Sequence, residues 1–372
     1  MSIPLSSLRE EPRHGFTAKD LRHGLLRQGG AALSSEYLRM IEALRKRYKT
    51  VLYERDWLGL PIVVLKAGGR EEPPVLVTAG ASAVEAAGVY AALELVMQVD
   101  VERAVYILPS RDPTGLHGAV YVLSEMLGEE VHVDTLSELR ELLKSRGAEV
   151  VIDTPTLFLS MLKGVGFAFS GSSREGAYGT LRQLEEKVVK GGLIESLGEV
   201  RILIPSQMPN VEGVGLLDRL MTVMVCEEGI LTYEHIGGEK VIPEVEVLRR
   251  FIQGREMGMV IDLHEGVDRG FYVLLSEEPL SGESIIIDLV LDQVARYGMQ
   301  LATQSALGES GLRALSDGVG VGKGRCGLID FTVERSYSFA FFTGMNAPLE
   351  QRVKAHLTAC ISALNAYAIA RL

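Results

Sequence analysis

Short apolar runs alternate with helical patterns along most of the chain, and this alternation limits the folds that the sequence can adopt. Residues 75–79 and 104–108 are compact apolar runs typical of buried strands, and a helical pattern from about residue 83 to 97 separates them. A third run, over residues 259–263, leads into His264. Strands and helices in this order predict an α/β protein with a mixed, mostly parallel central sheet and helices on both faces.

The length and composition of the chain suit one large globular domain. It has 372 residues, of which 47% are hydrophobic and 23% charged, an ordinary balance for a folded protein. Residues 1–35 are polar and rich in arginine and glycine, so we expect an N-terminal arm there and a single α/β domain over residues 36–372. The segment between residues 120 and 240 follows the alternation poorly, and we expect an insertion within it.

Charge and cysteine content argue against several classes of function. The formal net charge of −11 disfavours nucleic acid as a partner, because nucleic-acid-binding proteins usually carry a basic surplus. The sequence has no apolar signal segment and no apolar run long enough for a membrane span. Cys226, Cys326 and Cys360 lie far apart without a CxxC motif, which predicts a cytoplasmic protein and argues against a cysteine-ligated zinc site. The scarcity of asparagine, with three residues, is typical of a thermophile.

The strongest candidate for chemistry is the segment IDLHEG, residues 261–266, which places a histidine between two carboxylates. An imidazole at the end of a buried strand can bind a metal or transfer a proton near neutral pH. Asp262, two residues before the histidine, or Glu265, directly after it, could orient the ring. The alternative is a structural role, in which His264 is hydrogen-bonded to one of these two carboxylates.

Carboxylates follow two other runs that are expected to be strands. Glu85 comes shortly after the first core run, and Glu334 ends a strand expected over residues 328–333. Functional sites of α/β sheets gather at the carboxyl ends of strands, so these groups could meet His264 there. Two of the three would hold a cation and the third would act as a base, as in a metal-assisted hydrolase. Alternatively, Glu85 is a solvated carboxylate in a helical first turn, and Glu334 pairs with Arg335.

The order of several motifs resembles the zinc carboxypeptidases and their relatives that deacylate amino acids. Five segments are similar to motifs of this family and follow one another in the family's order. They are residues 78–88 (the first metal motif), 108–115 (the proline-containing loop), 262–264 (the third metal motif), 331–334 (the general-base strand) and 348–353 (the closing helix). The resemblance covers roughly residues 36–370. It implies the zinc-carboxypeptidase-like form of the α/β fold, of the phosphorylase/hydrolase-like type.

Carried over onto this chain, the resemblance implies that Glu85 and His264 bind zinc and that Glu334 is the general base of an amide hydrolase. The implied substrate is a small peptide or an N-acyl amino acid, and Arg111 and Asn210 are the residues expected to bind its carboxylate. Neither nucleic acid nor a membrane is an expected partner, and the sequence leaves the oligomeric state open.

One departure from the family's pattern bears directly on the metal. Ser82 stands where the family has its first ligand histidine, and a neutral hydroxyl is a poor replacement for an imidazole as a ligand of zinc. His117 and His235 are candidates for a replacement ligand. A second hypothesis therefore stays open, in which the chain keeps the fold and the pocket but has a binding or regulatory role without zinc catalysis.

Overall fold

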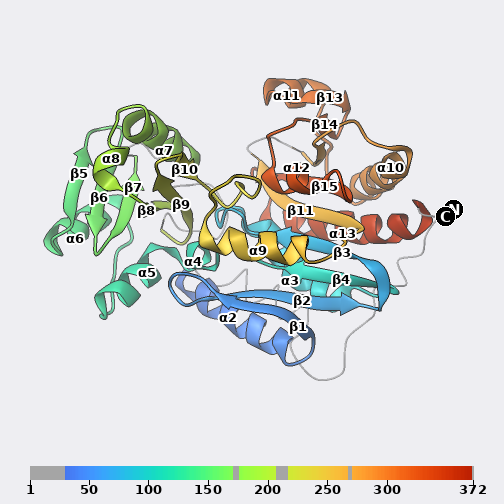
Figure 1. The fold of residues 1–372 in the computed structure, drawn as a ribbon, viewed down its shortest axis with the longest axis horizontal. Helices are drawn as coiled ribbons and strands as arrows, with labels where there is room; N and C mark the ends of the chain where they lie inside the picture. The colour runs from blue at the N-terminus through green and yellow to red at the C-terminus, as the bar shows by residue number, and fades with distance from the viewer. Residues whose placement is uncertain (1–29, 171–175, 207–216, 267–269, 371–372) are drawn as a thin grey trace.

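The computed structural model describes residues 30–170, 176–206, 217–266 and 270–370 (Figure 1). Its centre is a nine-stranded sheet with the order β1-β2-β4-β3-β11-β15-β12-β14-β13. These strands are β1 (Lys49–Arg55), β2 (Pro61–Gly68), β3 (Glu71–Ala79), β4 (Arg103–Leu108), β11 (Met259–Gly266), β12 (Tyr272–Leu275), β13 (Arg313–Ser316), β14 (Val319–Val321) and β15 (Tyr337–Gly344).

The four middle strands, β4, β3, β11 and β15, run parallel to one another, and antiparallel pairs are added on both sides of them. The prediction of a mixed central sheet is therefore confirmed. β11 lies between β3 and β15, so that Ile261 is opposite Val77 on one side and Phe339 on the other. A strand in this position is covered on both faces, which explains why the sequence leading to His264 is continuously apolar.

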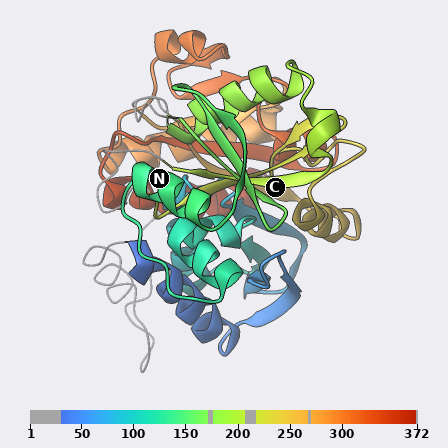
Figure 2. The same ribbon diagram turned by 90° about the vertical axis from the view of Figure 1, so that its left-hand side faces the viewer.

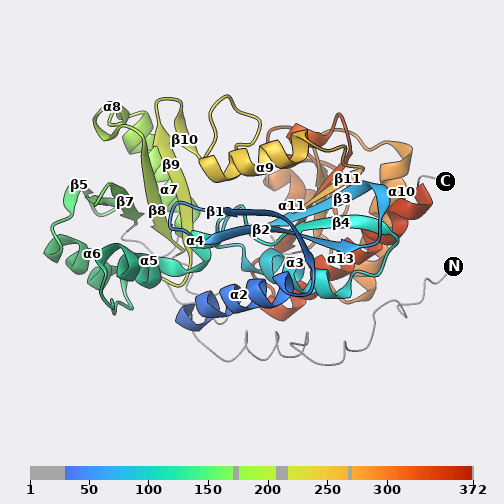
Figure 3. The ribbon, with the colours of Figure 1, turned by 60° about the horizontal axis from the view of Figure 1, so that its bottom comes forward.

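Helices cover both faces of the sheet, as the sequence predicts (Figure 3). One face carries α2 (Gly30–Arg45), α3 (Ala86–Gln98), α10 (Ser281–Arg296) and α13 (Leu349–Ala370), and the other carries α9 (Pro243–Gln253) and α12 (Gly327–Thr332). Ile261 and Leu263 pack in the core with α3 and α13, whereas Val260 packs with α9 and α12. Because side chains alternate along a strand, Asp262 and His264 face the side of α9 and α12.

A second sheet, with the order β10-β9-β8-β7-β6-β5, stands beside the first in Figure 1 and faces the viewer in Figure 2. It has apolar cores of its own. Its strands are β5 (Glu149–Asp153), β6 (Phe158–Leu162), β7 (Val165–Phe169), β8 (Val200–Pro205), β9 (Leu220–Cys226) and β10 (Gly229–Leu231). The accompanying helices are α4 (Pro113–Leu116), α5 (Gly118–Leu127), α6 (Leu136–Ser145), α7 (Gly176–Leu184), which continues into a π-helical turn (Glu185–Val189), and α8 (Ile194–Leu197). Most of these elements fall within residues 120–240, the segment in which we expect an insertion, and the division into domains stays a prediction.

Local sequence signals account for several helix ends. Pro243 occupies the first turn of α9, where the missing backbone N–H costs no hydrogen bond. Thr135 and Glu138 form a capping box at the start of α6. Gly128 ends α5 in the left-handed conformation, with a φ of 73°. The helix α2 begins at Gly30, inside the predicted arm of residues 1–35, and residues 1–29 lie outside the described residues.

The strand predicted over residues 328–333 is wrong, because this segment forms the short helix α12. Its buried side chains are spaced as on one side of a helical turn and belong to Leu328, Ile329 and Thr332. The next strand, β15, starts only at Tyr337. No helix among the described residues is both long and apolar enough to cross a lipid bilayer.

Candidate metal centre

His264 lies near the carboxyl end of β11 with a carboxylate at each ring nitrogen. Its Nδ1 atom is 2.9 Å from Glu85 Oε2, and its Nε2 atom is 2.9 Å from Asp262 Oδ2. Asp262 reaches the ring because side chains two residues apart share one face of a strand. Glu265 points to the opposite face, where it forms a buried ion pair with Arg352 of α13. Asp262 is therefore the flanking carboxylate that orients the imidazole.

Glu85 is held beside His264 by the segment between β3 and α3. It directly precedes the first residue of α3, and its side chain is buried. Oε1 of Glu85 accepts a hydrogen bond from the Tyr178 hydroxyl, and Oε2 accepts one from the backbone N–H of Glu265 at 3.3 Å. Tyr178 belongs to α7 and so brings the second sheet into the site. Glu85 and His264, which the sequence places in one metal site, are thus brought together.

Arg111 is positioned by the loop that follows β4, and its charge is directed at Asp262. Its Nη2 atom is 2.6 Å from both carboxylate oxygens of Asp262, and Thr78 Oγ1 donates to Oδ1 of the same carboxylate at 2.7 Å. Burial disfavours the charge on Asp262, but Arg111 and His264 outweigh this effect and hold the pKa of Asp262 below its ordinary value. Arg111, expected to bind a substrate carboxylate, therefore binds a carboxylate of the protein itself.

Two further side chains complete a group of donors around Nε2 of His264. Cys326, directly before α12, places its Sγ atom 3.6 Å from His264 Nε2 and 3.5 Å from Asp262 Oδ2. Glu234, in the segment after β10, has its Oε1 atom 3.7 Å from the same Nε2. One donor atom from each of Glu234, Asp262, His264 and Cys326 lies within 4.8 Å of all the others. This combination of carboxylate, imidazole and thiol donors could hold a metal ion.

The charges of this group are set by burial and by close contact between its members. Burial opposes a charge on His264, but Asp262, Glu234 and other neighbours outweigh it and hold the pKa of the imidazole well above its ordinary value. Burial raises the pKa of the Cys326 thiol to about 12 and also raises the pKa of Glu234. In the absence of a bound cation, the imidazole is therefore protonated and the thiol is neutral.

An aromatic stack covers one face of the imidazole. The rings of His264 and Phe342 are 4.9 Å apart between centroids and inclined by 17°, and Phe342 stacks in turn on Tyr272 at 4.7 Å. Phe342 is the residue of β15 that pairs with His264 of β11. The end of β15 thus presents an apolar ring to the site.

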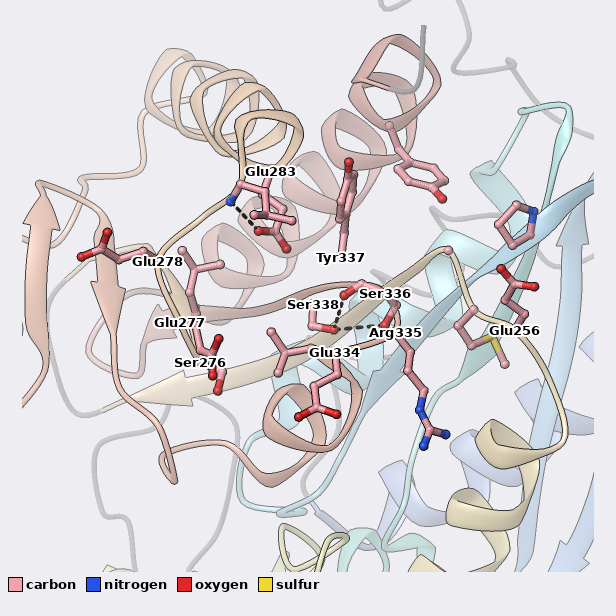
Figure 4. Close-up of a pocket in the computed structure, with 17 residues that line it drawn as sticks. Glu256, Ser276, Glu277, Glu278, Glu283, Glu334, Arg335, Ser336, Tyr337 and Ser338 are labelled. Carbon is pink, nitrogen blue, oxygen red and sulfur yellow. Dashed lines mark hydrogen bonds between the residues drawn. The ribbon is translucent and has the colours of Figure 1, made fainter.

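Glu334 is not brought to His264. It is exposed in the turn between α12 and β15, before the start of β15, whereas His264 lies near the carboxyl end of β11. Since β11 and β15 are parallel, Glu334 lies at the opposite edge of the sheet. It lines a separate cavity of about 360 Å³ together with Glu256, Glu277 and Tyr337 (Figure 4). The strand that was expected to carry Glu334 to the site is the helix α12.

The other candidates from the sequence lie in different surroundings. Asn210 falls outside the described residues. His117 is buried, and its Nδ1 atom donates a hydrogen bond to the backbone carbonyl oxygen of Pro113 at 2.8 Å. Burial lowers the pKa of His117 to about 4. His235 is exposed, with its Nδ1 atom 2.9 Å from the backbone nitrogen of Thr232. Neither histidine belongs to the group of four donors around His264.

Comparison with known proteins gives only remote similarity. No family model matches the sequence, and no curated protein matches it. Among solved structures, a candidate metallopeptidase from Shewanella amazonensis is 14% identical, with a TM-score of 0.46, covering 89% of this chain and 92% of the other. A metallo-carboxypeptidase from Burkholderia cenocepacia is 12% identical, with a TM-score of 0.43, covering 90% and 69% of the two chains. Carboxypeptidase A from Helicoverpa armigera is 12% identical, with a TM-score of 0.42, covering 92% and 73%. Similarity at this level assigns neither a family nor an activity to the chain.

Proposed function

We propose that this protein binds a divalent metal ion, with zinc as the natural candidate, beside His264 and hydrolyses an amide bond. The proposed substrate is a small peptide or an N-acyl amino acid, as the resemblance to zinc carboxypeptidases implies. The observation that carries the proposal is the position of His264, near the end of a central strand with carboxylates at both nitrogens and a thiol nearby.

The donors around His264 fit zinc better than the motif comparison alone implies. That comparison supplies Glu85 and His264 but leaves Ser82 where an imidazole is needed. Asp262 and Cys326 offer oxygen and sulfur donors in its place, with Glu234 close by, and zinc binds imidazole, carboxylate and thiolate together. When bound, zinc supplies the Lewis acidity that polarises a carbonyl group.

The proton transfers of hydrolysis need a carboxylate that a substrate can reach. Glu234 is the most exposed member of the group, with 32% of its side chain accessible. A carboxylate beside the metal site that a substrate can reach is placed to act as a general base. We therefore assign the role of general base to Glu234 rather than Glu334, which lies at the other edge of the sheet. Arg111 positions Asp262.

The second candidate function is that of a binding or regulatory protein without zinc catalysis. Two observations favour it: Ser82 replaces the expected ligand, and the aromatic ring of Phe342 stacks on the imidazole. Protonated His264 between two carboxylates would then be a structural feature of the core.

Metal analysis combined with activity measurements separates these functions. The full chain is stripped with a chelator and dialysed against zinc, and the bound metal is counted by mass spectrometry. We expect one equivalent of zinc and hydrolysis of blocked dipeptides or N-acyl amino acids. His264→Ala should lose both, whereas His132→Ala, at an exposed histidine paired with Glu130, should keep both. Stoichiometric zinc without hydrolysis would support the binding role, and a protein that takes up no zinc would contradict the proposal.

A further inference from the structure

Resting on the proposed function, we infer that the metal lies on the Nε2 side of His264, where Asp262, His264 and Cys326 are its protein ligands. In this arrangement, Glu85 is a positioning residue that holds the imidazole by its other nitrogen. The ligand set therefore differs from the one that the motif comparison implies, and one of its members is a cysteine.

The two sides of the imidazole offer different donors. On the Nδ1 side, the groups next to Glu85 are the neutral hydroxyls of Ser82 and Tyr178. On the Nε2 side lie a carboxylate, a thiol and the second carboxylate of Glu234. A thiolate and carboxylates bind zinc far better than alcohols do. The Nε2 side is therefore the stronger metal site.

The spacing of the donors on this side is close to that of a tetrahedral zinc site. Bonds of about 2.0–2.3 Å from zinc to nitrogen, oxygen and sulfur place neighbouring donors roughly 3.3–3.8 Å apart. Cys326 Sγ lies 3.6 Å from His264 Nε2 and 3.5 Å from Asp262 Oδ2, within this range. The remaining edge, 2.9 Å between Nε2 and Oδ2, is at present a hydrogen bond and would open by about 0.4 Å on binding.

Glu85 has the contacts expected of a carboxylate that orients a metal-bound histidine. Such histidines commonly donate the N–H of the free ring nitrogen to a carboxylate. Oε2 of Glu85 lies 2.9 Å from His264 Nδ1, and Tyr178 donates to Oε1. The carboxylate is thus held from both ends, which fixes the ring with Nε2 directed at Cys326.

Charge balance supports the same position. A Cys326 thiolate and the carboxylates of Asp262, Glu234 and Glu85 carry four negative charges, and a divalent cation with the Arg111 guanidinium neutralises three of them. Binding releases the proton of Nε2 and the proton of the thiol to solvent, so that the cation replaces two protons. Three protein ligands and a more exposed Glu234 leave the fourth position open, as in catalytic zinc sites.

Cobalt substitution tests this inference with a spectroscopic signal that is independent of activity. One equivalent of cobalt(II) is added to the metal-free full chain, and the near-ultraviolet thiolate-to-cobalt charge-transfer band is recorded. X-ray absorption of the zinc form counts the sulfur ligands. We expect the band and one sulfur in the wild type. The sulfur ligand is detected in the wild-type protein itself, so this test does not depend on whether any variant folds.

Three variants identify the residues. Cys326→Ser should lose the band, and Cys360→Ala, at the buried cysteine of α13, should keep it. Glu85→Gln should keep the band while metal affinity falls about 10–100-fold, the usual effect of removing an orienting carboxylate. One equivalent of metal without sulfur, or a band that disappears in Glu85→Gln, would overturn the inference. A chain that binds no metal overturns the proposed function as well, whereas sulfur-ligated metal without hydrolysis overturns the proposed function alone.

Discussion

Arg111 Nη2 lies 2.6 Å from both carboxylate oxygens of Asp262, and both side chains are almost completely buried. This pair connects the loop after β4 to β11, two strands away in the sheet. A buried ion pair adds little to stability compared with apolar residues of the same size, but the loss of one partner leaves an uncompensated charge in the core. The rigidity of Asp262, and with it the orientation of His264, therefore depends on Arg111.

We expect Arg111→Met to destabilise the protein by about 3–5 kcal/mol, because the carboxylate of Asp262 loses its main partner. The change is measured by urea denaturation. Arg313→Met provides the control, since Arg313 pairs with Glu278 at the exposed surface and its loss should cost less than about 1 kcal/mol. If both substitutions lower the free energy of unfolding equally, the buried pair contributes no more to stability than the exposed pair.

A clash of backbone atoms makes Gly327 a sensitive position. A Cβ atom added there would lie 1.7 Å from the carbonyl oxygen of Glu234, and a backbone group cannot turn away as a side chain can. Gly327→Ala should destabilise the protein by about 1–3 kcal/mol and weaken metal binding, because it pushes Glu234 away from Cys326. At Gly308 of α11 (Gln304–Glu309), a Cβ would meet nothing within 4 Å. Gly308→Ala should therefore stabilise the protein by roughly 0.5–1 kcal/mol. Thermal unfolding of both variants and the wild type measures the two changes in stability.

Asp112 makes stability depend on pH. Burial raises the pKa of its carboxyl from the ordinary 3.8 to about 7, although the backbone N–H of Gly115 opposes this shift. Because the folded protein holds this proton more tightly than the unfolded chain, the contribution of Asp112 to stability is complete below about pH 4 and is lost as the pH rises through about 7. Asp112→Asn keeps an acceptor for Gly115 and removes the titration.

We therefore expect the wild type to lose up to about 3 kcal/mol more stability than Asp112→Asn between about pH 5 and pH 8. Urea midpoints at the two pH values give this difference directly. Parallel curves for the two proteins would mean that the carboxyl titrates at its ordinary pKa in the folded state.

Tyr178 connects the second sheet to Glu85, and its hydroxyl can be removed without loss of the ring. Tyr178→Phe should cost about 1.5–3 kcal/mol, the usual value of a hydrogen bond to a charged group. Tyr53→Phe is the control, because the Tyr53 ring keeps its contact with the guanidinium of Arg45, 4.1 Å away, without the hydroxyl. The two are compared by chemical denaturation, and a cost for Tyr178→Phe as small as that of the control would argue against a strong bond to Glu85.

The sequence predicts the centre of the fold well because the relevant signals are local. The apolar run before His264 becomes β11, and the helical pattern expected from about residue 83 to 97 becomes α3, which spans Ala86–Gln98. Asp262 could also be recognised from the sequence, because two residues on one strand share a face.

The error at residues 328–333 also has a physical cause. A short apolar run fits a strand and a buried helical turn equally well, and here burial of Leu328, Ile329 and Thr332 selects the helix. The strand that follows, β15, starts only at Tyr337. Glu334 therefore lies at the opposite edge of the sheet from His264.

Cys326 and Glu234 gave no signal in the sequence as partners of His264. They lie 62 and 30 positions away from it along the chain, and no motif connects them. The wide separation of the cysteines argued against a thiol in a metal site, but the fold brings Cys326 to Nε2 of His264. Such contacts arise from the packing of α12 and the segment after β10 against β11, which local patterns do not encode.

The strand order has a consequence for how the protein is made. β11 and β15 occupy the middle of the central sheet, yet they come from residues 259–266 and 337–344, late in the chain. While the ribosome is still adding these residues, the apolar edge of β3 has no neighbour and is open to pairing with other nascent chains. The sheet closes, and Cys326 reaches His264, only after residues 326–344 have been synthesised. Zinc bound at the proposed site would therefore be acquired after the central sheet has closed rather than guide the early steps of folding.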